Sequence, residues 1–352
     1  MDNVNTNNFE YDETGYRKAL HDAMEQEYDK IKKELDEKLV ITVMGMVNAG
    51  KSTLLNQLLD EQRSSTSPVP GWTKDVSIRK IGKNVVITDT PGLEDVNESV
   101  ANKTLEHLKT TDIILYVFPS QPGITKPQID SFHKVLKEQR PTLAVFNVFF
   151  RESLEPNVLD QMITTAKSTL NFTPFIDISA KSGYNVDRVE KWTRDTLHTQ
   201  GKELLWAKIT RKKDETVKKW ILHAALEAAK IEFSMIETPI SIPDVKIKLV
   251  IDIQARLIIR IASAYGEEMS YEKAEAFVSS LIEGVMVPNI FGCSFIDLFE
   301  AVKAGIFTYI LGMVMKEYFK SRMKISIDEI PQMIKKYHNE AGKYIKPFIN
   351  KH

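Results

Sequence analysis

Residues 45–53, GMVNAGKST, are the stretch of sequence that decides the fold. They contain the pattern G-x-x-x-x-G-K-[ST] without a mismatch. Glycines allow backbone N–H groups to curl around a phosphate with no Cβ in the way. An apolar, β-branched run at residues 39–45 predicts a buried strand before the loop, and a helix is predicted at residues 52–59. In this setting the pattern predicts a loop that binds the phosphates of a nucleotide.

Each residue type in this loop has a role in binding a polyphosphate. The helix that follows directs the positive end of its dipole at the anion. Lys51 is expected to reach the β- and γ-phosphates as a point charge. The hydroxyl of Ser52 is expected to ligate Mg²⁺, which keeps several waters. The residues expected to bind the phosphates are Asn48, Ala49, Gly50, Lys51, Ser52 and Thr53.

A second motif, Asp89-Thr90-Pro91-Gly92, follows a predicted strand at residues 84–88. A carboxylate at the end of a strand beside the phosphate loop can hold Mg²⁺ through water, so Asp89 is a candidate metal residue. Gly92 lets its backbone N–H approach a γ-phosphate and release it after hydrolysis. The motif is a common turn, and its place after the phosphate-loop strand makes it a candidate part of the same site.

Strands and helices alternate through the first part of the chain. The predicted strands Val76–Ile81 and Asn84–Thr88 flank Gly82-Lys83 as a hairpin would. Further apolar runs follow at residues 112–118, 142–149 and 175–179. This alternation predicts an α/β fold of the P-loop NTPase type with a mostly parallel sheet.

Helical periodicity replaces the alternation after residue 200, so a separate all-α domain is predicted there. The expected helices cover about 202–233, 245–265, 270–282, 295–322 and 328–345. The expected domains are an N-terminal helix at 1–38, the α/β domain at 39–200 and the helical domain at 201–352.

Composition limits the class of protein. The chain has 352 residues, enough for two domains, and its formal net charge of -1 gives no global case for a nucleic-acid binder. The single cysteine, Cys293, can form no internal disulfide. The polar N-terminus lacks the apolar region of a secretory signal, so we expect a cytoplasmic protein.

Two segments leave interactions open. Residues 304–315, AGIFTYILGMVM, are too short to span a bilayer, which needs about 20 apolar residues. We expect a buried helix there and no transmembrane segment, with a peripheral membrane contact as the alternative. Residues 208–219, KITRKKDETVKK, are basic, and a solvated helix face is the expected interpretation. If the protein contacts RNA or the ribosome, we expect the contact at this run.

Residues 39–197 resemble the Era-like GTPases, a bacterial class that includes tRNA-modification and ribosome-assembly GTPases. The phosphate loop is similar to the family's G-x-x-N-x-G-K-S-[ST], and PGWTKD at 70–75 is similar to its switch I motif. DTPG at 89–92 matches its switch II motif, and SAKSG at 179–183 is similar to its base-binding loop. The resemblance implies a Ras-like G domain that binds GTP and GDP and hydrolyses GTP with Mg²⁺.

The resemblance also assigns roles to single residues. Thr73 would close on Mg²⁺ and the γ-phosphate in the triphosphate state. The catalytic candidates are therefore Lys51, Thr73 and Gly92, and the metal candidates are Ser52, Thr73 and Asp89. The base-binding candidates are Asn147, Ser179, Ala180 and Lys181.

The chain departs from the family at the N-K-x-D motif, where Asn147-Val148-Phe149-Phe150 stands. In the family the Asp accepts two hydrogen bonds from guanine, each worth roughly 1.5–3 kcal/mol. Its replacement by Phe150 should weaken guanine binding and blur the discrimination from adenine. A nucleotide-binding module with relaxed base specificity and weak hydrolysis therefore stays open beside the GTPase.

A second difference from related enzymes affects the expected rate of hydrolysis. Leu93 stands where Ras-type enzymes carry a glutamine that positions water, so intrinsic hydrolysis should be slow. In several Era-like enzymes an asparagine at the place of Asn48 helps to hold K⁺, and the resemblance implies K⁺-stimulated hydrolysis here. The alternative is that Asn48 only shapes the loop. A G-domain homodimer is the usual companion of such a K⁺ site.

Two functional classes remain open. In the first, a molecular switch, GTP orders the loops at Thr73 and Gly92, and the helical domain senses the state. The second is an assembly or membrane GTPase of the dynamin-like or immunity-related kind, in which the N-terminal helix would pack with the C-terminal helices in one bundle. The C-terminal half weakly resembles a helical domain of unknown function found behind some Era-like G domains. The Era-like motifs favour the switch.

Overall fold

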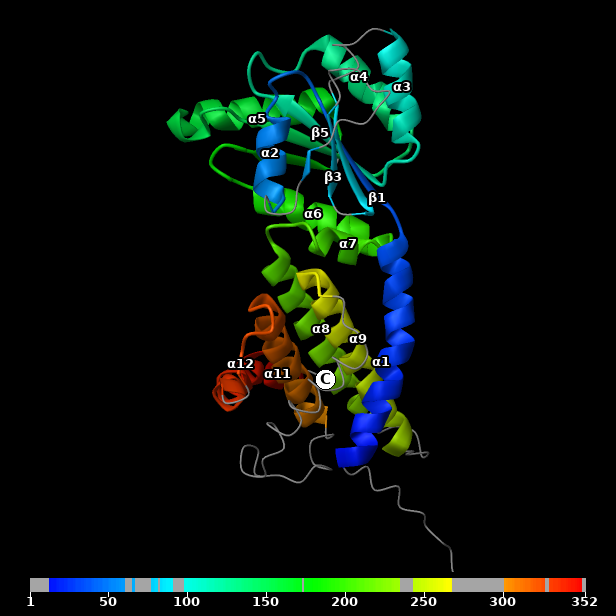
Figure 1. Ribbon diagram of the computed structural model, residues 1–352. Coiled ribbons are helices and arrows are strands. Elements are labelled where there is room, and N and C mark those ends of the chain that lie inside the picture. Colours follow the sequence, from blue (N-terminus) through cyan, green and yellow to red (C-terminus); the bar gives the residue numbers. More distant parts are fainter. Residues whose placement is uncertain are drawn as a thin grey trace, which may run out of the picture. The chain divides into compact units, whose positions relative to one another are not determined.

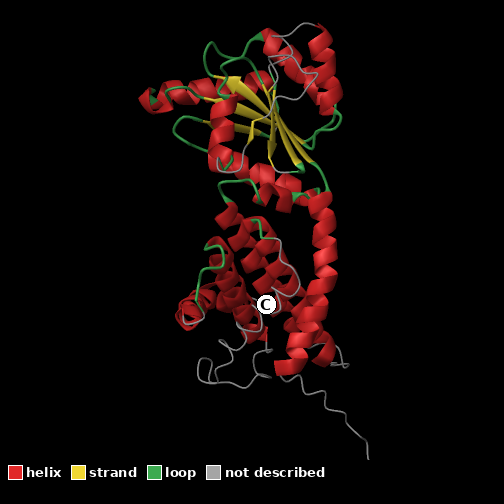
Figure 2. Cartoon of the chain, viewed as in Figure 1, coloured by secondary structure: helices red, strands yellow, loops and turns green. Residues whose placement is uncertain are grey.

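The computed structural model describes residues 13–60, 65–66, 77–81, 83–90, 98–172, 174–234, 243–267, 301–326 and 329–349. These residues form two compact units (Figure 1). One unit is Glu34–Lys212, and the other combines the residues up to Lys33 with those from Lys213 onward. The strands belong to the first unit, and the described part of the second is helical (Figure 2).

The Glu34–Lys212 unit is an α/β domain. Its strands are β1 Leu39–Met44, β2 Ser65–Thr66, β3 Ser77–Ile81, β4 Val85–Asp89, β5 Ile113–Pro119, β6 Thr142–Asn147 and β7 Phe175–Ile178. Its helices are α2 Lys51–Leu58, α3 Glu98–Leu108, α4 Lys126–Leu136, α5 Pro156–Leu170, α6 Val186–Thr199 and α7 Glu203–Ala207, with a 3₁₀ turn, η2, at Arg151–Ser153.

Within the described residues, seven strands form one sheet in the order β2-β3-β4-β1-β5-β6-β7. The strands β4, β1, β5, β6 and β7 run parallel to one another, whereas β3 is antiparallel to both β2 and β4. The predicted mostly parallel α/β fold and the predicted hairpin are therefore confirmed. The short strand β2 was not predicted.

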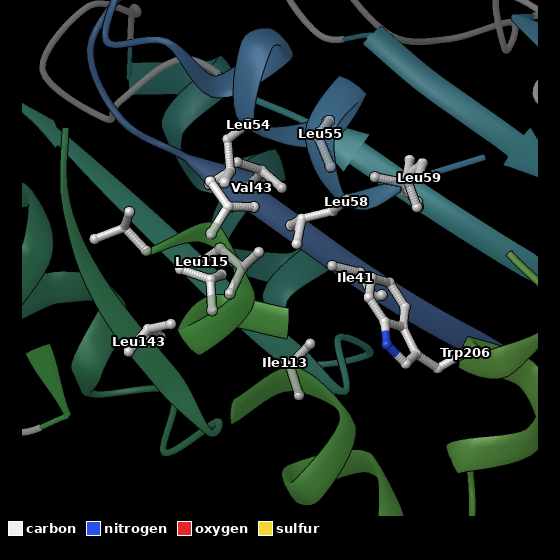
Figure 3. Packing of buried hydrophobic residues seen from close by; sticks show 14 of the residues in the cluster. Ile41, Val43, Leu54, Leu55, Leu58, Leu59, Ile113, Leu115, Leu143 and Trp206 are labelled. Carbon is white, nitrogen blue, oxygen red and sulfur yellow. The ribbon is translucent and has the colours of Figure 1, made fainter. Parts of the chain in front are cut away.

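Helices cover both faces of the sheet. Because the side chains of a strand alternate between its faces, each central strand contributes to both cores. On one face Ile113, Leu115 and Val117 of β5 join a core with residues of α2, α6 and α7. Figure 3 shows the α2 leucines packed beside β1 in this core. On the other face, Ile114, Tyr116 and Phe118 pack with residues of α3, α4 and α5. The strands buried between these two cores fix the positions of the loops that follow them.

Helix α7 belongs to the α/β unit, although the sequence-based boundary after residue 200 assigns it to the helical domain. Trp206 is 1% exposed and lies in the core beside β1 (Figure 3). Thr210 forms a β-bridge with Leu59, at the end of α2. The single helix predicted at 202–233 is therefore divided into α7 and α8, because the apolar residues of α7 are buried against the sheet.

The second unit contains most of α1 Glu13–Asp36 together with α8 Lys213–Ser234, α9 Pro243–Tyr265, α11 Ala301–Lys320 and α12 Ile330–Ile349. Residues 304–315 of α11 are all buried, which confirms the predicted buried helix. None of the helices in the described ranges combines the length and the apolar character that a bilayer crossing requires. The helix expected at 270–282 lies outside the described residues.

Helix α1 packs with the C-terminal helices through its described residues before Glu34. Ala23, Met24 and Ile31 are buried. The Glu27 carboxylate accepts a hydrogen bond from the Nε of Arg256, on α9, at 3.2 Å. The helical unit is thus assembled from two parts of the sequence that are separated by the α/β unit.

The basic run at 208–219 is not a uniformly solvated face. Arg211 is exposed, although its Nε donates to the carbonyl of Leu59 at 2.7 Å within the α/β unit. Lys213 is 8% exposed, and its ammonium lies 5.6 Å from the ring centroid of Tyr265 in the helical unit. Lys218 and Lys219 are exposed as expected. The basic surface available to a partner is therefore smaller than the run suggests.

Close packing of α11 against α8 depends on Gly305. A Cβ there would lie 2.9 Å from the backbone oxygen of Ala225 and 2.9 Å from the Cβ of Ala229. Gly305→Ala should lower the free energy of unfolding of the helical unit by about 1–2 kcal/mol, because overpacking outweighs the gain in helix propensity. Chemical denaturation of the full chain, followed by circular dichroism, measures this loss.

The control for this prediction is Lys219→Ala, an exposed position on α8. It should change stability by no more than about 0.5 kcal/mol. Equal stability of the Gly305→Ala variant and the wild type would contradict the close approach of the two helices.

Candidate nucleotide-binding site

The phosphate loop lies between β1 and α2, at the carboxyl edge of the parallel strands. Gly45 has φ 135° and Gly50 has φ 93°, values that L-residues rarely adopt. A Cβ on Gly45 would lie 2.1 Å from the carbonyl oxygen of Val117, and one on Gly50 would lie 2.2 Å from Nδ2 of Asn147. Both glycines are therefore required by the backbone conformation and by the approach of a neighbouring group.

The ammonium of Lys51 is held over this loop. It donates to the carbonyls of Gly45 at 2.9 Å and Met46 at 3.0 Å, and it lies 4.0 Å from Oδ1 of Asp89. Lys51 is also the first residue of α2, so the ammonium adds to the positive end of that helix dipole. The loop, the helix end and the lysine together form an environment that favours an anion.

Ser52 and Asp89 bring together two oxygen groups suited to Mg²⁺. The Ser52 hydroxyl donates to Oδ2 of Asp89 at 2.8 Å. Asp89 ends β4, and its register opposite Val43 of β1 places it beside the phosphate loop. The described residues contain no group of three or more histidine, cysteine or acidic side chains that could by itself hold a metal ion. This donor set fits Mg²⁺, which binds through one or two carboxylates together with phosphates and waters.

Asn147 joins the phosphate loop to the base-binding loop. This residue ends β6 and is 3% exposed. Its Nδ2 donates to the carbonyl of Ala49 at 2.9 Å, and its Oδ1 accepts from the backbone N–H of Ala180 at 3.0 Å. One side chain thereby brings the two predicted binding loops into the same site.

The base-binding loop follows β7 and forms a tight turn. The carbonyl of Ser179 accepts from the N–H of Gly183 at 2.8 Å, and the N–H of Ser179 donates to the carbonyl of Tyr184 at 3.1 Å. Ser179 and Ala180 are buried, whereas Lys181 is exposed. The backbone of this loop is therefore rigidly placed next to Asn147.

The residues that depart from the family motif have different surroundings. Val148 is fully buried in the sheet core. Phe150 is 63% exposed and has a left-handed φ of 54°, and its ring lies 5.8 Å from the ammonium of Lys181. No carboxylate stands at either position, as the sequence requires.

Glu152, on η2, is a site residue that sequence reasoning missed. Interactions with the side chains of Ser182 and Ser179, on the base-binding loop, lower the pKa of its carboxyl group, and the interaction with Ser182 is the largest cause. An acidic residue shortly after the altered motif was the available sequence signal.

The predicted site residues that the structure describes lie at one edge of the sheet. They are Asn48, Ala49, Gly50, Lys51, Ser52, Thr53, Asp89, Asn147, Ser179, Ala180 and Lys181. Thr73 and Gly92 lie outside the described residues, as do the switch I motif at 70–75 and Leu93.

The family model described as 50S ribosome-binding GTPase matches residues 40–148. GTPase Der of Thermotoga sp. is 29% identical over 172 residues, which are 45% of this chain and 39% of that protein. The tRNA modification GTPase MnmE of Protochlamydia amoebophila is 31% identical over 153 residues, 36% of this chain and 33% of that protein. The chain therefore spans well under half the length of these relatives.

Among solved structures, Era of Aquifex aeolicus bound to GDP and aluminium fluoride aligns with 55% of this chain and 68% of that chain at 23% identity. Its TM-score of 0.34 is too low to support any conclusion. The sequence relatives and the matched family model agree with the motifs at the sheet edge. The predicted resemblance of the α/β unit to the Era-like P-loop GTPases is therefore confirmed, and residues 40–148 match a GTPase family model.

Proposed function

We propose that this chain binds GTP, hydrolyses it to GDP and phosphate, and uses the difference between the two states as a molecular switch. The observation that carries the proposal is the double hydrogen bond of Asn147, which places a phosphate loop and a base-binding loop in one site. The proposal extends to the whole chain an activity that its relatives carry by name.

The residues at this site suit phosphoryl transfer, which depends on positioning and charge stabilisation more than on covalent chemistry. The loop N–H groups, the amino end of α2 and the Lys51 ammonium would stabilise negative charge that develops on the phosphates. Ser52 and Asp89 would hold Mg²⁺, which neutralises phosphate charge when bound. By resemblance, Thr73 and Gly92 would close on the triphosphate and open after hydrolysis.

K⁺ stimulation is the finer part of this proposal. Leu93 cannot orient a water by hydrogen bonding, so another source of charge stabilisation is needed. Asn48 has a left-handed φ of 64°, a conformation that asparagine tolerates well. Its amide would help to hold K⁺ beside the phosphates, as in the family, with a G-domain homodimer as the companion arrangement.

A second candidate function, nucleotide-dependent assembly, is favoured by one observation. The described residues of α1 up to Lys33 belong to the same compact unit as the C-terminal helices, and Glu27 contacts Arg256 within it. This is the bundle that an assembly or membrane GTPase of the dynamin-like or immunity-related kind would need.

The first test removes the ammonium of Lys51. Lys51→Ala should weaken binding of fluorescent GTP by about 100-fold or more, because the phosphates lose a charge-assisted partner. Lys134→Ala, at an exposed position on α4, is the matched control and should bind as the wild type does. Unchanged affinity of the Lys51→Ala protein for GTP would contradict the assignment of this loop to phosphate binding.

The second test separates the two roles of Asn48. The wild type should hydrolyse GTP faster in K⁺ than in Na⁺ at equal ionic strength. Asn48→Gly keeps the left-handed backbone but lacks the amide, so it should bind GTP and lose the K⁺ stimulation. Equal wild-type rates in the two salts would end the K⁺ proposal, and stimulation retained in the variant would mean that Asn48 only shapes the loop.

The third test decides between switch and assembly. With a non-hydrolysable GTP analogue, a switch should form nothing larger than the G-domain dimer in analytical ultracentrifugation. It should not sediment with anionic liposomes. Higher oligomers or liposome pelleting that require the analogue, and that are lost in Lys51→Ala, would establish the second candidate instead.

A further inference from the structure

We propose that the carboxylate of Glu152 recognises guanine, taking the place of the acid that the motif lacks at Phe150. The inference rests on the proposed nucleotide site and adds the residue that selects the base. Guanine presents two donors on one edge, the N1–H and the 2-amino group, and a carboxylate can accept from both.

The turn at Phe150 brings η2 next to the site. Asn147 fixes the end of β6, and the chain then reverses through the left-handed φ of Phe150. The N–H of Ser153 donates to the carbonyl of Phe150 at 2.9 Å and closes the turn. The phenyl ring is thereby directed to solvent, and the residues that follow it are returned toward the sheet edge.

Arg151 then fastens η2 to the base-binding loop. Its Nη1 donates to Oδ2 of Asp177, on β7, at 2.8 Å, and its guanidinium lies 3.8 Å from the ring centroid of Tyr184. Asp177 precedes the base-binding loop and Tyr184 ends it. The Arg151 side chain is only 11% exposed, so these contacts hold the neighbouring residue, Glu152, in place.

Two serines of the same loop act on the Glu152 carboxylate. Ser182 and Ser179 both lower its pKa, and the N–H of Ala180, between them in the sequence, donates to Asn147. A carboxylate has about four lone-pair positions, so interactions with two serines leave acceptors for a base. Glu152 is exposed and can be reached by a ligand. A glutamate is ionised at neutral pH, and the lowered pKa, caused first by Ser182, favours the ionised form further.

A purely structural role predicts different behaviour. If Glu152 only ties η2 to the loop, its removal should affect all nucleotides alike. If Glu152 recognises the base, a change in its hydrogen-bonding pattern should change which base is preferred. Xanthine separates these roles, because it keeps the N1–H of guanine and carries an oxygen in place of the 2-amino group.

The test is Glu152→Gln in the full chain, with fluorescent GDP, xanthosine diphosphate and ADP as probes. The glutamine oxygen can still accept from N1–H, but its NH₂ group opposes the guanine amino group and suits the xanthine oxygen. We expect GDP affinity to fall about 10- to 100-fold and xanthosine diphosphate affinity to rise by a similar factor. ADP binding should not change.

The matched control is Glu155→Gln, an exposed acid just beyond η2 whose side chain makes no cap hydrogen bond. It should keep the wild-type order of affinities. Unchanged GDP affinity in Glu152→Gln, or an equal loss for all three nucleotides, overturns the role of Glu152 while leaving GTP binding intact. Equal wild-type affinity for GDP and ADP also overturns it, because no group then selects guanine. A wild type that binds no nucleotide overturns the proposed function itself.

Discussion

The buried amide of Asn147 is the interaction on which the geometry of the whole site depends. It satisfies one carbonyl of the phosphate loop and one N–H of the base-binding loop, which come from distant parts of the sequence. Breaking either bond would leave a buried polar group without its partner, which costs more than the bond itself contributes. This explains why the asparagine remains while Val148 and Phe150 depart from the motif. Asn147 supports the protein's own loops, whereas the family's Asp, replaced here by Phe150, serves the base.

The sheet places that amide correctly because its central strands are parallel and buried on both faces. The carboxyl ends of parallel strands meet at one edge, so the loops after β1, β6 and β7 converge there with the end of β4. The pairing of Val43 with Asp89 sets the carboxylate beside the phosphate loop. A shift of one residue in that register would turn Asp89 to the opposite face. The packing of the sheet core fixes this register and therefore the position of the Asp89 carboxylate at the site.

Local patterns predicted most of this fold and site. The glycine loop, the hairpin and the alternating strands depend on neighbouring residues, so the sequence alone revealed them. The sequence did not predict the division between α7 and α8, because Trp206 fits the helical periodicity of residues 202–233. Only the burial of Trp206 in the sheet core distinguishes the two helices. Glu152 was missed for a related reason. Its link to Ser182 requires the left-handed turn at Phe150, which no residue preference announces.

The helical unit can form only when two distant parts of the sequence come together. Its parts before Glu34 and after Lys212 come together although the whole α/β unit separates them in the sequence, and closing so long a loop costs entropy. Contacts inside the α/β unit reduce this cost. The ammonium of Lys202 donates to the carbonyl of Lys38 at 2.8 Å, and the N–H of Leu204 donates to the Glu34 carboxylate at 3.3 Å. Once the α/β unit is folded, these contacts hold its first residues beside the start of α7, which shortens the loop that the helical unit must close. Folding of the α/β unit should therefore favour assembly of the helices.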